Sequence, residues 1–81
     1  MTFLIVDDEI AARTDLVKVL GIVEKDAEVL QASGAEEALA ACRQTAIDVA
    51  LVDIRMPQTD GLALAKEITA LSPRTNFIPR S

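Results

Sequence analysis

The chain has 81 residues, of which 51% are hydrophobic and 26% are charged, and its net charge is -5. This length allows one domain with a small core, and the composition is too apolar for a disordered chain. The acidic balance offers no basic patch for direct nucleic-acid binding, the lack of histidine removes imidazole bases and the usual zinc ligands, and a single cysteine excludes an intrachain disulfide.

The first predicted element is a strand over residues 1–6, which is apolar on both faces and therefore central in a sheet. A helix is predicted over residues 10–20, because apolar residues recur there with helical spacing, and Gly21 is predicted to end it. That helical face comprises Ala12, Leu16, Val19, Leu20 and Val23. Residues 28–32 carry polar residues at both ends, which is typical of an edge strand.

A second helix is predicted to begin at a capping box, in which Ser33 is the cap and Glu36 reaches back to it. The helix runs to about Gln44. Its predicted inner stripe consists of Ala35, Ala38, Leu39 and Cys42. Cys42 is therefore interpreted as a small core residue rather than a reactive thiol.

A strand is predicted over residues 47–52, because the four consecutive apolar residues 49–52 suit a strand buried on both faces. A third helix follows the turn at Asp60 and Gly61 and is predicted to end before Ser72. Its apolar face comprises Leu64, Ile68 and Leu71. Strand and helix thus alternate three times over residues 1–72, which predicts an α/β, doubly wound (flavodoxin-like) parallel sheet with strand order 2-1-3.

Acidic residues follow the first and third predicted strands. Asp7, Asp8 and Glu9 come after the first, and Asp53 ends the third. In this strand order the two strand ends flank the topological switch point, where ligands bind. An isolated Asp after a strand is most often a turn residue or a helix cap, and Asp7 and Asp8 could simply complement a helix dipole. Their joint placement at the switch point favours a functional site.

Converging carboxylates repel one another unless a cation lies among them. Oxygen ligands without histidine or thiolate favour Mg²⁺ or Mn²⁺, which would damp the charge and orient a phosphoryl group toward Asp53. Asp53 would then be a nucleophile that forms an aspartyl phosphate. The pattern therefore predicts a phosphoryl-accepting site.

These residues resemble the receiver domain of two-component response regulators, and the likeness extends from Met1 to about Ile78. It is carried by Asp7, Asp8 and Glu9, by Asp53 with Met56 and Pro57, and by Asp60 and Gly61. The resemblance implies that Asp53 accepts phosphate from a histidine kinase or a small phosphodonor. It also implies that Asp8 and Asp53 bind the metal directly, that Asp7 contributes through water, and that the backbone carbonyl of Arg55 completes the site.

The C-terminal segment, residues 73–81, departs from the family. A fourth strand begins at Asn76, and Pro79 is expected to stop it after Ile78, because proline cannot donate to a sheet ladder. The chain is therefore predicted to be one receiver domain, residues 1–81, truncated after the third helix. The family's hydroxyl residue and lysine on the later strands are not found, and Lys66 is not expected to replace that lysine.

The predicted function is a phosphoryl-accepting receiver domain, not an enzyme, that is impaired in switching. The alternative is a self-associating interaction module whose acidic metal pocket is vestigial. A small aspartate-nucleophile phosphohydrolase would want a second acid where Arg55 stands, and a dinucleotide-binding half-domain would need a glycine-rich turn after the first strand.

Self-association is predicted because the third strand is expected to keep a long unpaired edge. An apolar patch is also expected to be exposed, from either Ala50 and Val52 or Val49 and Leu51. A partner chain would then complete the sheet in a homodimer or larger oligomer. With no apolar leader and no apolar run of about 18 residues, we expect a cytoplasmic location and no membrane partner.

Overall fold

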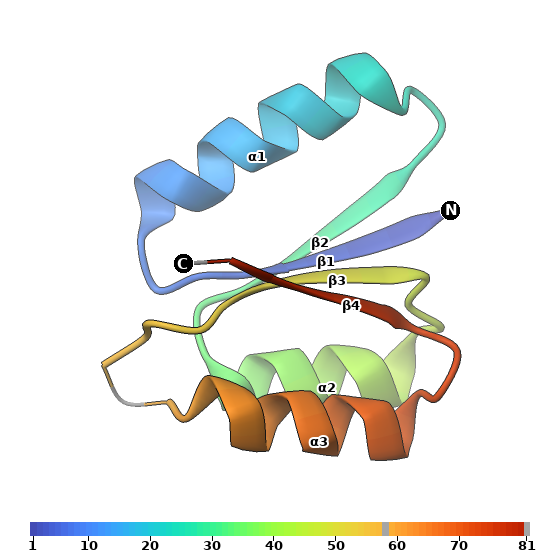
Figure 1. The fold of residues 1–81 in the computed structure, drawn as a ribbon. Helices are drawn as coiled ribbons and strands as arrows, with labels where there is room; N and C mark the ends of the chain where they lie inside the picture. The colour runs from blue at the N-terminus through green and yellow to red at the C-terminus, as the bar shows by residue number, and fades with distance from the viewer. Residues whose placement is uncertain (58, 81) are drawn as a thin grey trace.

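The computed structural model of the protein describes residues 1–57 and 59–80. Within this part of the chain, four parallel strands form one sheet in the order β2-β1-β3-β4, with α1 on one face and α2 and α3 on the other (Figure 1). The strands are Thr2–Val6 (β1), Glu28–Ala32 (β2), Val49–Asp53 (β3) and Asn76–Arg80 (β4), and the helices are Ile10–Val23 (α1), Ala35–Gln44 (α2) and Gly61–Leu71 (α3). The predicted doubly wound α/β fold is confirmed, including the strand order 2-1-3.

β1 lies between β2 and β3 because both of its faces are apolar. Leu4, Ile5 and Val6 are completely buried. Successive side chains of a strand alternate between the faces, so Leu4 and Val6 join the core under α2 and α3 while Ile5 faces the α1 side. The carboxyl-terminal ends of β1 and β3, which carry the predicted site, therefore lie side by side.

β4 is longer than the sequence indicated. It continues through Pro79 to Arg80 and pairs with β3 at five positions. The Asn76 N–H donates to the carbonyl oxygen of Asp48 at 2.8 Å, and the Ile54 N–H donates to that of Arg80 at 2.9 Å. Alternate residues of β4 thus bond to β3, and Pro79 turns its missing N–H toward the free edge of the sheet, where proline is tolerated. The prediction that Pro79 stops the strand was wrong.

This pairing also corrects the prediction of an unpaired edge on the third strand, because β4 covers β3 and the free edge belongs to β4. Ala50 and Val52 are completely buried on the face of α2 and α3, so they form no exposed patch. Val49 and Leu51, on the opposite face, are partly exposed. Ser81, the final residue of the C-terminal segment 73–81, lies outside the described residues.

α1 extends beyond its predicted end and contains Gly21. Gly21 does not adopt the left-handed conformation of a helix cap, and the Glu24 N–H continues the helical pattern by donating to the Leu20 carbonyl oxygen at 2.7 Å. The predicted apolar face is poorly covered, since no side chain of α1 is buried and Val19 and Val23 are 54% and 68% exposed. In the described residues no helix has the length and apolar character required to cross a bilayer.

α2 begins with a different cap from the predicted one. Gly34 is the N-cap residue, and both the N–H and the hydroxyl of Ser33 donate to the carboxylate of Glu37. The partner is Glu37 rather than Glu36, because the helix starts one residue later than a cap at Ser33 requires. Cys42 is buried, and burial raises the pKa of its thiol, so the side chain is a protonated core residue as predicted.

α3 begins directly against the loop that follows β3. The Asp60 carboxylate caps it by accepting hydrogen bonds from the N–H groups of Leu62 and Ala63 at 3.0 and 3.3 Å. A Cβ on Gly61 would lie 2.8 Å from the Ile54 Cα, so only glycine fits at this contact. The apolar face of α3 then packs on the sheet through Leu64 and Ile68, both buried.

Candidate functional site

Three carboxylates converge where β1 and β3 end. Asp7 and Asp8 follow β1 directly, and Asp53 is the last residue of β3. One carboxylate oxygen of each residue lies within 4.8 Å of the other two. The structure therefore brings together the three acids that the sequence pattern singled out, at the switch point of the sheet.

The three acids have different surroundings. Asp7 is buried, and its Oδ1 accepts a hydrogen bond from the Glu9 N–H at 2.9 Å. Asp53 is half-buried, and its Oδ1 accepts one from the Arg55 N–H at 2.9 Å, whereas Asp8 is exposed. Backbone groups thus fix the orientation of Asp7 and Asp53, and Asp8 faces solvent.

A cavity of about 400 Å³ lies beside these acids. Its lining residues are Asp7, Asp8, Glu9, Ala12, Asp53, Arg55, Pro57 and Arg80. Arg55 comes from the loop after β3 and Arg80 from the end of β4, so positive and negative side chains share the cavity. Glu9 lines it without joining the group of converging carboxylates.

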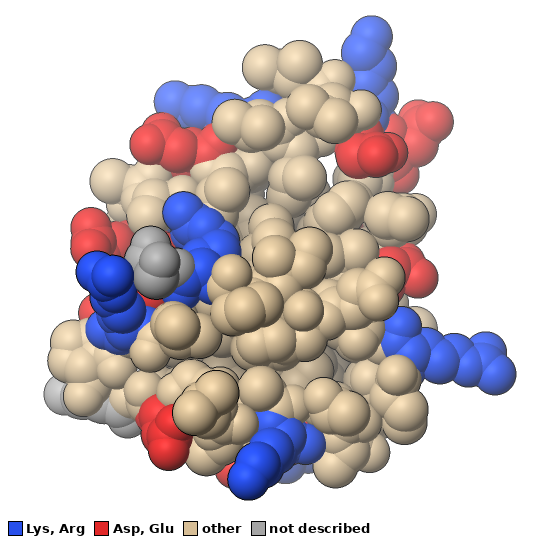
Figure 2. Space-filling model, in the orientation of Figure 1, with Lys and Arg blue, Asp and Glu red and all other residues tan. Residues whose placement is uncertain are grey.

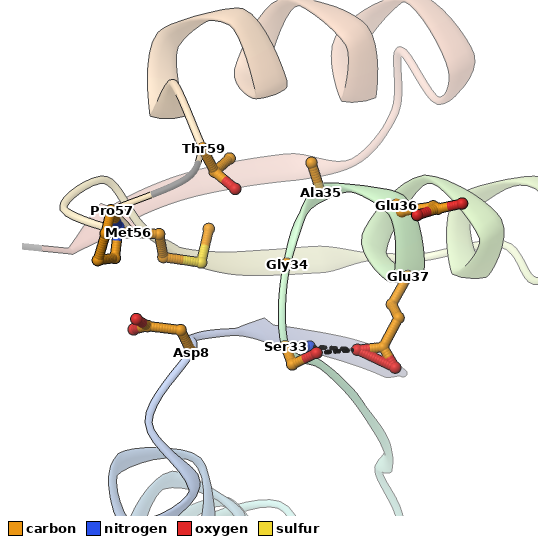
Figure 3. A pocket seen from close by; sticks show the side chains of 9 residues that line it. All are labelled: Asp8, Ser33, Gly34, Ala35, Glu36, Glu37, Met56, Pro57 and Thr59. Atoms are coloured by element: carbon orange, nitrogen blue, oxygen red, sulfur yellow. Dashed lines mark hydrogen bonds between the residues drawn. The ribbon is translucent and has the colours of Figure 1, made fainter.

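A second hollow, of about 630 Å³, adjoins the first and shares Asp8 and Pro57 with it (Figure 3). Figure 3 shows Asp8 and Pro57 at one end of this hollow and Glu36 and Glu37 at the other. Although it is larger, neither Asp7 nor Asp53 lines it. We therefore assign the chemistry to the smaller cavity, where the carboxylates converge.

The donor set suits a hard divalent cation. The grouped ligand atoms are all carboxylate oxygens, which Mg²⁺ and Mn²⁺ prefer and which zinc rarely uses alone. Asp8 and Asp53 could bind such an ion directly. Both oxygens of Asp7 already have donors close by, from Glu9 and Arg80, so Asp7 is better placed to act through water.

Arg80 was not identified from the sequence, because the fourth strand was expected to end before it. Its Nη1 lies 3.4 Å from the Asp7 Oδ2, and it is the register partner of Asp53. A signal was available: a proline in an edge strand can turn its nitrogen outward, which extends the strand and brings Arg80 to the end that carries Asp53.

Arg13 was also missed. It lies in α1, and its Nη1 donates to the carbonyl oxygen of Asp7 at 2.6 Å while its Nε donates to the Gln31 Oε1 at 3.3 Å. This side chain ties α1 to the ends of β1 and β2. No pattern in the sequence indicates this role, because the partners of Arg13 are a backbone carbonyl and an amide distant along the chain.

Comparison with known proteins identifies close relatives. The chain matches the response regulator receiver domain family over residues 3–80. It is 43% identical over 70 residues to the positive alginate biosynthesis regulatory protein of Pseudomonas aeruginosa, covering 84% of this chain and 28% of that protein. It is 34% identical over 79 residues to the cyclic di-GMP phosphodiesterase response regulator RpfG of Xanthomonas campestris, covering 98% of this chain and 21% of that protein. The chain thus spans less than a third of either relative.

Solved structures agree with the sequence match. A CheY-like response regulator receiver domain protein from Methanospirillum hungatei superimposes with a TM-score of 0.88 at 31% identity, over 96% of this chain and 61% of that one. The complex of the histidine kinase ThkA with the response regulator protein TrrA matches with a TM-score of 0.81 at 32% identity, over 96% of this chain and 66% of that one.

Proposed function

Because the chain belongs to the response regulator receiver domain family, we propose that it accepts a phosphoryl group on Asp53 in a two-component system. One observation carries the proposal: oxygens of Asp7, Asp8 and Asp53 lie within 4.8 Å of one another where β1 and β3 end. Turn residues or caps would have no reason to converge in this way. The phosphorylated chain would be a stoichiometric signalling phosphoprotein, not an enzyme.

In the proposed reaction a carboxylate oxygen of Asp53 attacks the phosphorus atom of the donor. The new O–P bond forms as the P–N bond of a phosphohistidine, or the P–O bond of a small phosphodonor, breaks. The leaving group takes the electron pair, and a proton from water where it needs one. The Arg55 N–H, 2.9 Å from the Asp53 Oδ1, holds the carboxyl in a fixed orientation for this attack.

Mg²⁺ or Mn²⁺, when bound, supplies positive charge that offsets the carboxylates and orients the phosphoryl oxygens. We propose Asp8, Asp53 and the backbone carbonyl of Arg55 as direct ligands and Asp7 as a ligand through water. The different surroundings of Asp7 and Asp8 support this division, since Asp7 is buried with its oxygens engaged and Asp8 is exposed.

A histidine kinase or a small phosphodonor is the proposed partner, in the cytoplasm where a kinase has access to ATP. The likeness to a response regulator that was solved with a histidine kinase supports this choice.

Mass spectrometry tests the proposal after incubation with acetyl phosphate and Mg²⁺. We expect one added phosphoryl group in the wild type and in Asp26→Asn, a control that removes the same charge from an exposed loop residue. Asp53→Asn should remain unmodified. Modification of Asp7 or Asp8, or an unchanged yield in Asp53→Asn, would contradict the assignment of the acceptor.

Self-association is the second proposed function, and the exposed apolar surface favours it. Figure 2 shows a broad uncharged area over β4, with charged groups around its rim. Ile78 of β4 is 45% exposed, and it lies on the face of the sheet opposite to the core under α2 and α3. We propose a homodimer, or a larger oligomer, that covers this surface.

Sedimentation equilibrium at micromolar concentration tests the oligomer. Ile78→Lys should shift the wild-type assembly toward the monomer, because it buries a charge in the proposed interface. Leu62→Lys, which changes a 74% exposed residue on α3, is the matched control and should not. A wild type that sediments as a folded monomer would exclude self-association.

A further inference from the structure

Arg80 stands at the end of β4, beside the site but outside the set of residues that the family pattern supplies. It pairs with Asp53 in the register of β3 and β4. Register partners on neighbouring strands place their side chains on the same face of a sheet. Both residues also line the cavity of about 400 Å³ that contains Asp7 and Asp8. The guanidinium is therefore in the same compartment as the proposed acceptor oxygen.

The Arg80 guanidinium is already paired with one acid of the site. Its Nη1 lies 3.4 Å from the Asp7 Oδ2, and the two side chains are 36% and 5% exposed. A charge pair in this half-buried setting is screened less than one in open water. Since a guanidinium carries several N–H donors, a single contact with Asp7 leaves donors for a second anion.

We propose that Arg80 is a phosphate-binding residue of this site, an inference that rests on the proposed phosphorylation of Asp53. Before transfer, Arg80 offsets the charge of Asp7. After transfer, it donates hydrogen bonds to the phosphoryl oxygens on Asp53, for which the planar fork of an arginine is well matched. Lys66 does not compete for this role, since it lines a different cavity with Phe77 on the α3 side of the sheet.

This role predicts opposite effects on two ligands. Arg80→Gln removes a positive charge from beside Asp7, so Mg²⁺ should bind about two- to fivefold more tightly. The same change removes a charge-assisted donor, so an anionic phosphoryl mimic should bind about ten- to a hundredfold more weakly. Arg80→Lys keeps the charge without the fork and should be intermediate for the mimic. A residue that only supported the fold would weaken both ligands together.

The experiment is a pair of titrations on the intact chain. Mg²⁺ alone is titrated by calorimetry, and beryllofluoride is titrated by fluorine NMR at saturating Mg²⁺. The proteins are the wild type, Arg80→Gln, Arg80→Lys and the control Arg74→Gln, which removes the same charge from an exposed residue before β4. We expect Arg74→Gln to match the wild type and Arg80→Gln to show the two opposite shifts.

Two outcomes overturn the inference in distinguishable ways. If the wild type binds beryllofluoride and Arg80→Gln binds it equally well, or binds both ligands less well, Arg80 is not a phosphate-binding residue while Asp53 phosphorylation stands. If the wild type itself binds no beryllofluoride in the presence of Mg²⁺, the proposed phosphoryl acceptance fails and the role of Arg80 fails with it.

Discussion

The two faces of the sheet differ in how completely helices cover them (Figure 1). On the face of α2 and α3, side chains from the strands and helices form one continuous core. Its buried members are Leu4, Val6, Ala32, Ala38, Cys42, Ile47, Ala50, Val52, Met56, Leu64 and Ile68. On the other face, α1 buries none of its own side chains, and Ile78 of β4 is 45% exposed.

The stability of the domain and the placement of the acidic residues therefore depend on different parts of the molecule. Most of the apolar burial that stabilises the domain lies on one face. The positions of the acids depend instead on where β1 and β3 end. Each face also supplies one contact beside the site, because Arg13 of α1 bonds to the Asp7 carbonyl oxygen and Gly61 of α3 packs against the loop after Asp53. The site can therefore form although one face is only partly covered.

The largest expected change in stability comes from shortening a side chain on the covered face, and it is compared with the same kind of change on the other face. Ile68→Ala empties a completely buried position of the covered face and should lower the free energy of unfolding by about 2–5 kcal/mol. Val19→Ala, on the 54% exposed face of α1, should change it by less than about 0.5 kcal/mol. Urea unfolding measures both. Equal losses in the two variants would show that α1 is covered in solution.

The second-largest expected effect concerns Gly61, where α3 on the covered face contacts the loop that follows Asp53. Gly61→Ala places a Cβ 2.8 Å from the Ile54 Cα, so backbone must move, and we expect a loss of about 1–3 kcal/mol in stability. Because Ile54 directly follows Asp53, the variant should also weaken Mg²⁺ binding. Urea unfolding and a Mg²⁺ titration test this together, and an unchanged stability would show that the contact is not tight.

Much of this fold was predictable because its signals are local. Two-sided apolar runs identified the central strands, helical spacing identified the helices, and the right-handed crossover rule gave the order 2-1-3. The errors arose where a local signal had two outcomes. Pro79 can end a strand or lie on its free edge, and Gly21 can end a helix or be carried within it.

The candidate site was predictable to the extent that strand ends determine it. Asp7, Asp8 and Asp53 follow apolar runs, so topology alone brings them together. Arg80 and Arg13 could not be found in that way. Their positions depend on the register of β3 and β4 and on the reach of long side chains across elements, neither of which leaves a periodic signal in the sequence.

A smaller effect of the opposite sign is expected on the α1 side. Gly21 lies inside α1 with no atom within 4 Å of an added Cβ, so Gly21→Ala should fit without strain. Alanine is the better helix former and restricts the unfolded chain, and stability should rise by about 0.5–1 kcal/mol. Thermal unfolding of Gly21→Ala and Gly61→Ala under the same conditions compares their effects on stability directly. A loss of stability in Gly21→Ala would mean that this part of α1 is packed against something in solution.

The smallest effect is a pH dependence at the start of α2. Hydrogen bonds from the hydroxyl and the N–H of Ser33 lower the pKa of the Glu37 carboxyl. A carboxyl whose pKa is lower in the folded state stabilises that state above its unfolded pKa of about 4.3, and this stabilisation is lost as the pH falls through the folded pKa. The wild type should therefore lose stability between about pH 5 and pH 3 more steeply than Glu37→Gln, which cannot titrate.

Glu36→Gln is the matched control for this prediction, since it removes the same charge from the same helical turn but leaves the Ser33 contact intact. Urea unfolding at a series of pH values measures how steeply the stability of each variant changes with pH. If the Glu36→Gln and Glu37→Gln slopes coincide, the Ser33 contact is not formed in solution, and the cap of α2 depends on the backbone of Gly34 alone.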